Sequence, residues 1–396
     1  AGVDGDTSIP ISGITTIHGS TANDTLVVTE IVGLHTENVW TIDQNNGGNI
    51  NGILFFTGFE NLQGSRFTDR FLLQDGKGIS GSIDGGDGDD TLAYDAGSQP
   101  YMTPIQVNLE SASATNVPRF NNVEHFRGSK SLRDTFVGMN VASNWQVTAR
   151  DSGTVATNDA TFTLAGFENL SGGNLGDTFV ISEGASITGT IDGGPGTDTL
   201  NASAFRDSMT VDITARNRGE IRATSRITGF SGVEHLLSGS GNDNFVFAPG
   251  ALLTGTLDGG EGLADHVDFS AWSSPVTVDL NMDGARPLGG RNRNIEHATG
   301  GRGNDRLTGN ARANRLIGGG GDDTLTGLDG ADILIGDHAT FRVNSNDLRV
   351  IETTEFSTGN DQLVGGGGDD VVMGGLGDDT INTGNGNNAV VADTGR

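Results

Sequence analysis

The residues best placed to do chemistry in this sequence are aspartates at the sixth position of a nine-residue unit. The unit is G-G-x-G-x-D-x-U-x, with U aliphatic, and near-complete copies begin at Gly300, Gly318, Gly327, Gly365 and Gly374. Glycine allows positive φ and close approach of backbone carbonyls, and carbonyl and carboxylate oxygens are the ligands that Ca²⁺ prefers. The unit therefore predicts a calcium-binding turn followed by a short strand.

The sixth-position carboxylates are the first candidates for metal ligands. Weaker copies begin at Gly309, Phe356 and Thr383, so the units form two runs of four. Asn314 and Asn388 replace the aspartate in two copies, where we expect a weaker site because one charge is lost. The predicted ligands are the carboxylates of Asp305, Asp323, Asp332, Asp361, Asp370 and Asp379, helped by the backbone carbonyls of Gly300, Gly318, Gly327, Gly365 and Gly374.

This nonapeptide resembles that of the RTX (repeat-in-toxin) family. The resemblance implies a parallel β-roll that binds several Ca²⁺ ions, in which six residues turn and bind calcium, three form a strand, and two units make one coil. Units two apart in sequence then stack, which pairs the units that begin at 300 and 318, 309 and 327, 356 and 374, and 365 and 383. We predict four parts: a long-repeat β-helical region over 1–299, β-roll blocks over 300–335 and 356–396, and an inserted β-hairpin over 336–355.

A longer and looser repeat occupies the region before residue 300. One element reads G-F-E-N-L-x-G, or carries Glu-His in place of Glu-Asn, and another reads G-x-[IL]-D-G-G-x-G. Both lead into an Asp-x-apolar step, and the steps recur at intervals near 21 residues or twice that, which predicts coils wider than those of the β-roll. Four of these aspartates are further candidate calcium ligands, with a plain Asx turn as the alternative: they are Asp90, Asp198, Asp243 and Asp265.

Composition supports a cation-binding protein. The net charge is −28, and the acids comprise 38 Asp against 13 Glu. Such a charge repels nucleic acid and attracts cations, and the short Asp side chain suits a turn that closes on itself or on a metal. A salt-adapted surface is the alternative explanation, and the presence of only two lysines fits it. Cysteine is absent, which excludes thiolate sites and disulfides, and no apolar run is long enough to span a membrane.

The Glu-His pairs raise the question of catalysis. They occur at Glu124-His125, Glu234-His235 and Glu296-His297, but the same place elsewhere holds Glu-Asn. A hydrogen bond at a corner of the coil explains both forms, so we do not expect a catalytic role. Trp40 and Trp145 follow Asp steps in equivalent places and are expected to pack in the core. Motifs for nucleotide binding, serine hydrolysis or zinc proteolysis are absent.

The sequence therefore predicts an all-β parallel solenoid with almost no helix, formed by wide β-helix coils followed by an RTX β-roll. The expected function is a calcium-dependent structural segment of a secreted bacterial surface protein, such as an adhesin stalk, a surface-layer unit or a fibre subunit. Resemblance to RTX proteins implies type I export. The first residues show no initiator Met and no signal peptide, so we expect a processed chain or part of a longer one. We also expect open ends that associate end to end or with flanking parts of a longer chain.

Three alternatives remain at this stage. The first is a carbohydrate-active enzyme on a β-helix, which would need a groove of acids outside the repeat positions. The second is a glycan- or protein-binding module that uses the 336–355 hairpin or the 31–50 and 137–160 loops. The third is an RTX folding and secretion tail, although the nonapeptides cover less than a quarter of the chain.

Overall fold

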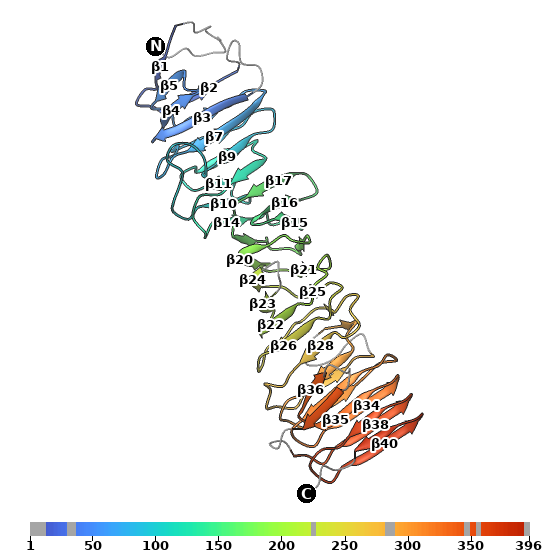
Figure 1. Ribbon diagram of the computed structural model, residues 1–396. Coiled ribbons are helices and arrows are strands. Elements are labelled where there is room, and N and C mark those ends of the chain that lie inside the picture. Colours follow the sequence, from blue (N-terminus) through green and yellow to red (C-terminus); the bar gives the residue numbers. More distant parts are fainter. Residues whose placement is uncertain are drawn as a thin grey trace. The chain divides into compact units, whose positions relative to one another are not determined.

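The computed structural model describes residues 13–29, 37–222, 227–281, 290–343, 349–353 and 358–391. The chain forms two compact units, one of residues 1–139 and 151–170, the other of residues 140–150 and 171–396. All regular elements in the described residues are strands, stacked mainly in parallel, which confirms the all-β parallel solenoid (Figure 1). None of the described residues forms a helix that could span a membrane.

The first unit stacks its strands in three sheets. One runs in the order β1 (Thr16–His18), β5 (Leu54–Thr57), β4 (Gly47–Ile50), β3 (Glu37–Gln44), β7 (Thr68–Leu73), β9 (Thr91–Ala93), β13 (His125–Arg127), β17 (Thr161–Ala165) and β16 (Ser152–Ala156). The others are β12 (Arg119–Asn121), β8 (Ser82–Asp84), β6 (Asn61–Gln63) and β2 (Thr25–Val27), and β11 (Ser113–Ala114), β10 (Gln106–Asn108) and β14 (Thr135–Val137). Strand β18 (Asn169–Ser171) lies at the boundary of the units.

The second unit also has three stacks and a separate hairpin. The first stack is β15 (Asn144–Ala149), β19 (Thr178–Ile181), β21 (Thr199–Asn201), β25 (His235–Leu237), β27 (Leu257–Asp258) and β30 (Asn292–Arg293). The second is β20 (Ile187–Asp192), β24 (Ile227–Ser231), β23 (Arg218–Arg222), β22 (Thr210–Ala215), β26 (Asn244–Phe247), β28 (His266–Asp268), β31 (His297–Thr299), β33 (Arg315–Gly319), β35 (Ile333–Asp337), β39 (Val371–Met373) and β41 (Ala389–Val391). The third is β29 (Thr277–Asp279), β32 (Arg306–Thr308), β34 (Thr324–Asp329), β38 (Gln362–Gly367) and β40 (Thr380–Asn385).

Strand register confirms the predicted coil lengths. Phe71 pairs with Leu92, 21 residues on, whereas Leu307 of the β-roll pairs with Leu325, 18 residues on. Some coils of the long-repeat region are longer because they contain antiparallel strands, as in β22–β23–β24, which the sequence did not predict. These additions leave the stacking intact, since Leu200 still pairs with the equivalent Leu236.

The two nonapeptide blocks form one continuous stack. The four predicted pairings of units are confirmed by the register of β32 on β34, β33 on β35, β38 on β40 and β39 on β41. In addition, β34 pairs with β38 and β35 with β39, so the second block stacks directly on the first. The intervening residues form the antiparallel hairpin of β36 (Ala339–Val343) and β37 (Arg349–Thr353). Its predicted turn at residues 344–346 lies outside the described residues, and the four-part domain division remains a prediction.

The core is a narrow column of inward side chains. In the β-roll each strand contributes a fully buried aliphatic residue to one of two facing columns. Leu307, Leu325 and Leu363 stack in one sheet, and Leu316, Leu334 and Val372 stack in the other. The first unit adds aromatic packing: Trp40 is fully buried and stacks on Phe71 with ring centroids 5.3 Å apart. Trp145 makes the same contact with Phe179 in the second unit, so both tryptophans are packing residues as predicted.

We expect Leu325→Ala to lower the free energy of unfolding by about 2–5 kcal/mol, because the cavity cannot close between two stacked leucines. Chemical denaturation in saturating calcium measures this value. The matched control in the same unit is Leu175→Ala, whose side chain is 53% exposed and should change the value by less than about 0.5 kcal/mol. Equal effects of the two substitutions would contradict a core formed by these stacked residues.

Candidate metal centres in the carboxylate ladders

Each repeat aspartate lies at the start of a strand or directly before it, and is tied to the coil before it. One carboxylate oxygen accepts the backbone N–H of the equivalent residue on that preceding coil. Asp305 donates its N–H to Asp323 Oδ1 at 2.6 Å, and Asp332 donates to Asp370 Oδ1 at 2.9 Å. In the first unit, Asp69 donates to Asp90 Oδ1 at 2.7 Å. The acids at this corner therefore form ladders along the stack rather than separate turns.

Two ladders run through the β-roll in register with its strands. In the first ladder, the backbone N–H of each residue donates to the side chain of the next residue in the series. The order is Val276, Asp305, Asp323, Asp361 and Asp379. The other begins before the β-roll and continues through it, in the order Asp243, Asp265, Glu296, Asn314, Asp332, Asp370 and Asn388. The long-repeat coils and the nonapeptide coils of this unit thus share one corner architecture.

The glutamate of the Glu-His and Glu-Asn pairs belongs to the same ladders. Asp198 donates its N–H to Glu234 Oε2 at 2.8 Å. The residue after the glutamate accepts from the next coil: Thr256 N–H donates to His235 Nδ1 at 2.9 Å, and Ser82 N–H donates to Asn61 Oδ1 at 3.0 Å. A corner hydrogen bond therefore explains both His and Asn at this place, as the sequence indicated.

The second carboxylate oxygen divides the aspartates into two classes, which we call open and closed. In a closed aspartate this oxygen accepts a hydrogen bond from within its own turn: Ser65 N–H donates to Asp69 Oδ2 at 2.7 Å, and Gly301 N–H donates to Asp305 Oδ2 at 2.5 Å. In an open aspartate, the residue is at most 1% exposed and its buried Oδ2 has no hydrogen-bond partner among the described residues. The open aspartates, each at most 1% exposed, are Asp90, Asp198, Asp265, Asp323, Asp332, Asp361 and Asp370.

The backbone at the second position of the turn separates the classes. In six open turns this residue has positive φ, for example 99° at Gly86, 114° at Gly319 and 79° at Leu328. In the closed turns of Asp69 and Asp305, the corresponding Ser65 and Gly301 do not adopt positive φ, and their N–H groups donate to the carboxylate. A left-handed second residue therefore leaves one carboxylate oxygen without its local donor.

The first residue of an open turn is a glycine, and two oxygens approach the place where its side chain would be. One is the open Oδ2 of its own turn, and the other is a backbone carbonyl oxygen of the next coil. A Cβ placed on Gly318 would lie 2.3 Å from Asp323 Oδ2 and 2.5 Å from the carbonyl oxygen of Gly336. At Gly327 the corresponding distances are 2.2 Å to Asp332 Oδ2 and 2.6 Å to the Gly365 carbonyl oxygen. At Gly318 and Gly327 a side chain would collide with both oxygens, so glycine is needed there. Carboxylate and carbonyl oxygens converging around an uncompensated charge fit a hard cation such as Ca²⁺.

The structure distinguishes among the candidates taken from the sequence. Asp305 and Asp243 are closed, the latter because Ser238 donates its hydroxyl to Oδ2. Asp379 is half-buried and accepts the Asp361 N–H at 3.0 Å. Four of the candidate backbone carbonyls lie next to the first glycine of the turn on the preceding coil: those of Gly318, Gly327, Gly365 and Gly374. In the long-repeat region the carbonyls of Gly85 and Gly193 have the same place.

The structure changes the assigned first residue of the nonapeptide unit that carries Asp361. The sequence placed the start of this unit at Phe356, which lies outside the described residues. A Cβ on Gly336 would lie 2.0 Å from Asp361 Oδ2 and 2.4 Å from the Gly374 carbonyl oxygen, the arrangement seen at every first-position glycine. Gly336 is therefore the first residue of this turn, and the hairpin is inserted inside the turn rather than before it. The sequence missed this because the two halves of the turn are separated along the chain.

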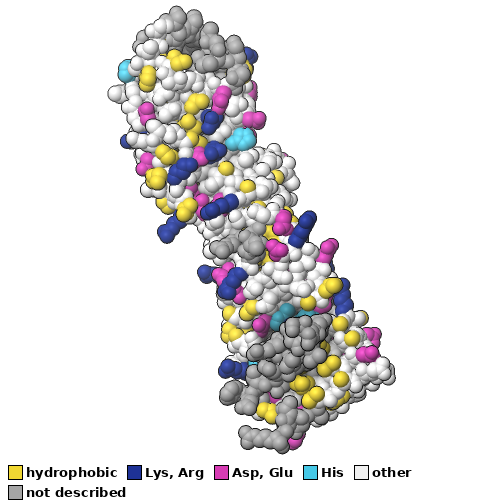
Figure 2. Space-filling view, viewed as in Figure 1, with side chains coloured by type: hydrophobic (Ala, Val, Ile, Leu, Met, Phe, Trp, Pro, Cys, Tyr) yellow, Lys and Arg dark blue, Asp and Glu magenta, His cyan; other side chains and the backbone are white. Residues whose placement is uncertain are grey.

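Burial sets the electrostatics of the open aspartates. It raises the pKa of Asp323 to about 8, of Asp90, Asp265 and Asp361 to about 7, and of Asp198 and Asp332 to about 6, with neighbouring carboxylates adding to each shift. These carboxylates lie inside the coils, unlike the acidic side chains on the surface shown in Figure 2. A buried carboxylate that must be charged at neutral pH needs a nearby cation.

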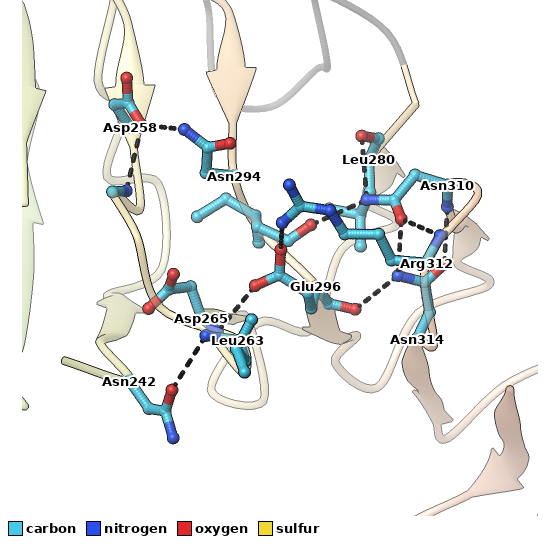
Figure 3. A network of polar contacts seen from close by, with 12 residues as sticks. Asn242, Asp258, Leu263, Asp265, Leu280, Asn294, Glu296, Asn310, Arg312 and Asn314 are labelled. Carbon is cyan, nitrogen blue, oxygen red and sulfur yellow. Dashed lines mark hydrogen bonds and ion pairs between the residues drawn. The ribbon is translucent and has the colours of Figure 1, made fainter. Parts of the chain in front are cut away.

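One step of the second ladder holds a cation supplied by the protein (Figure 3). Arg312 places its guanidinium nitrogen 2.6 Å from Glu296 Oε1, and the Glu296 side chain is 2% exposed. The other oxygen, Oε2, accepts the Asp265 N–H at 3.1 Å, and Asn314 Nδ2 donates to the Glu296 carbonyl at 2.9 Å. The step from Glu296 to Asn314 is thus neutralised without a metal, in line with the lost charge at Asn314.

The described residues contain no group of three or more His, Cys, Asp or Glu side chains that could hold a metal ion. A site made from one or two carboxylates and several backbone carbonyls is compatible with this finding. Such a site depends on the stacking of coils, because its carbonyl and its carboxylate come from different turns.

We expect the calcium-free protein to become less stable as pH rises from about 5 to about 8. Six of the seven open aspartates have folded pKa values above the ordinary 3.8, so the folded chain holds more protons than the unfolded chain in this range, and raising the pH removes them. Denaturant unfolding in chelator at several pH values measures the trend. Saturating calcium should reverse it, because calcium binds the deprotonated form. A calcium-free stability that rises with pH would contradict the assignment.

Four stretches of the chain match the family model of the RTX calcium-binding nonapeptide repeat, at residues 82–98, 190–209, 299–334 and 357–390. They contain six of the seven open aspartates, and Asp265 lies outside them. No curated protein matches the chain. The matched segments place the nonapeptide both in the β-roll and at two isolated turns of the long-repeat region. The chain therefore carries RTX calcium-binding repeats on a parallel β-solenoid fold.

Proposed function

We propose that this chain is a structural segment of a secreted bacterial surface protein that folds when it meets extracellular calcium. An adhesin stalk, a surface-layer unit and a fibre subunit are the forms that fit. The observation that carries the proposal is that seven repeat aspartates, each at most 1% exposed, have a buried Oδ2 without a hydrogen-bond partner in the described residues. Type I export, implied by the RTX nonapeptide, belongs to the same proposal.

The proposed mechanism couples charge to folding. Without calcium, the stacked open carboxylates repel one another in a buried environment, and the thin core offsets little of the chain entropy. With calcium, each ion neutralises a turn, and its binding energy becomes folding energy. Extracellular calcium modules bind at about 10⁻⁴–10⁻³ M, so the change in calcium on leaving the cell would act as the switch.

The proposed ligands are the open aspartates together with the carbonyls that face them. In the β-roll these carboxylates are Asp323, Asp332, Asp361 and Asp370, and upstream they are Asp90, Asp198 and Asp265. Asp305 and Asp243 are proposed to act as structural corners, because hydrogen bonds already engage both of their oxygens. Asp379 remains a candidate at the last step of its ladder.

A structural role is favoured over catalysis by how the repeat acids are used. In the open aspartates, one oxygen is committed to a backbone N–H of the preceding coil, and the other lies near a backbone carbonyl of the following coil. Such groups suit a resident ion better than a substrate. For self-association, β41 is the last strand of its sheet in the described residues, and it exposes Val390 and Val391, which offers a surface for end-to-end stacking.

We expect the chain to be largely unfolded in chelator and to gain β-structure cooperatively as calcium approaches about 10⁻³ M. Circular dichroism follows folding, and light scattering in the same titration follows assembly. A β-spectrum already complete in chelator would contradict calcium-coupled folding. Folding without any rise in scattering would contradict only self-association.

Substitution of open and closed aspartates separates metal binding from corner stability. Asp332→Asn keeps an acceptor for the Asn314 N–H but removes the charge, and it should raise the calcium midpoint by about tenfold, equivalent to about 1.4 kcal/mol. Asp305→Asn should lower stability with and without calcium alike and leave the number of bound ions, measured by calorimetry, unchanged. Equal loss of ions in both variants would show that the division into classes does not predict the ligands.

A further inference from the structure

The hairpin of β36 and β37 interrupts a proposed calcium turn. Gly336 supplies the first position of the turn, and the turn resumes at Gly359 and ends at Asp361, whose Oδ2 is open. Register places Asp337 opposite Gly319, the second-position glycine of the stacked turn. An aspartate thus occupies a position that the uninterrupted open turns fill with glycine or, once, Leu328.

Asp337 points along the stack toward the next turn. Its side chain is 1% exposed, and its Oδ2 accepts the N–H of Leu376 at 2.5 Å. A Cβ on Gly375 would lie only 2.3 Å from the same oxygen, so a glycine with φ of 118° is needed there. The Asp337 carboxylate therefore lies against the Gly374–Asp379 turn, whose Gly374 carbonyl also faces the open oxygen of Asp361 across Gly336.

We propose that Asp337 is a second carboxylate ligand of the calcium site at the Asp361 turn, so that this site takes ligands from both ends of the inserted hairpin. The inference rests on the proposed function, since it assumes that open turns bind calcium. Two carboxylates and the Gly374 carbonyl form an all-oxygen set suited to Ca²⁺. Consistent with a shared site, the charge of Asp337 is among the causes, after burial, that raise the pKa of Asp361 and Asp323.

The consequence is that calcium closes the base of the hairpin. Asp337 is the last residue of β35 and lies just before β36, and Asp361 follows β37 and directly precedes β38. An ion bound to both side chains joins the two ends of the insertion across the stack. The base of the hairpin is then fixed on the β-roll when calcium is bound.

The test uses the full chain and calcium alone. Asp337→Asn keeps an oxygen that can accept the Leu376 N–H and removes only the charge, so it should lose or weaken by about tenfold one calcium ion in calorimetry, while the other ions bind as before. The matched control is Asp378→Asn, an exposed aspartate in the facing turn, which should titrate as the unmodified chain does. Wild-type-like calcium binding by Asp337→Asn would overturn the inference.

Hydrogen exchange of the unmodified chain gives a second measurement that does not depend on a variant folding. The amides of β36 and β37 should gain protection together with those of β38 as calcium is added. Full protection of the hairpin in chelator, while β38 is unprotected, would also overturn the inference. If Asp332→Asn alters calcium binding and Asp337→Asn does not, only this inference fails. If neither does, the proposed function fails with it.

Discussion

The whole architecture depends on one constraint: a carboxylate is buried at the corner of each coil, and one of its oxygens is committed to the backbone of the coil before it. This bond sets the register of successive coils, since Asp305, Asp323 and Asp361 can align only when each side chain meets the preceding N–H. It also fixes where the second oxygen lies. The stability of the fold therefore depends on how that second oxygen is satisfied.

The second oxygen of the corner acid is satisfied in three different ways in this chain. Closed aspartates accept a donor from their own turn, as Asp69 does from Ser65. At Glu296 the charge is met by the Arg312 guanidinium. At open aspartates such as Asp332 the described residues supply no partner, and a neighbouring carbonyl adds further negative potential. Only the third arrangement calls for a metal, and it is concentrated in the nonapeptide coils, which are the shortest coils and have the thinnest core.

This distribution relates local backbone geometry to a property of the whole chain. A positive φ at the second residue of a turn removes a hydrogen bond worth about 1–3 kcal/mol to a buried charged group. Repeated along a ladder, that choice makes the free energy of folding depend on an external ion. The closed corners and the Arg312 pair reduce this dependence in other coils, so sensitivity to calcium is graded along the sequence. Insertions such as the hairpin leave the ladder intact because they enter at a turn.

The sequence by itself determined the class of fold, the coil lengths and the positions of the corner acids. Glycine spacing and aliphatic alternation are local properties, and they predicted the stacking of Leu307 on Leu325 and the hydrogen-bonding role of the Glu-His pairs. Only the tertiary structure decided which acids are open, because a motif such as that of Asp305 matches the nonapeptide and yet closes on Gly301. It also decided that Gly336 and Asp361 form one turn and that Asp337 reaches the next. The physical reason is that the partner of each second oxygen depends on backbone φ and on the neighbouring coil, and neither is contained in a nine-residue pattern.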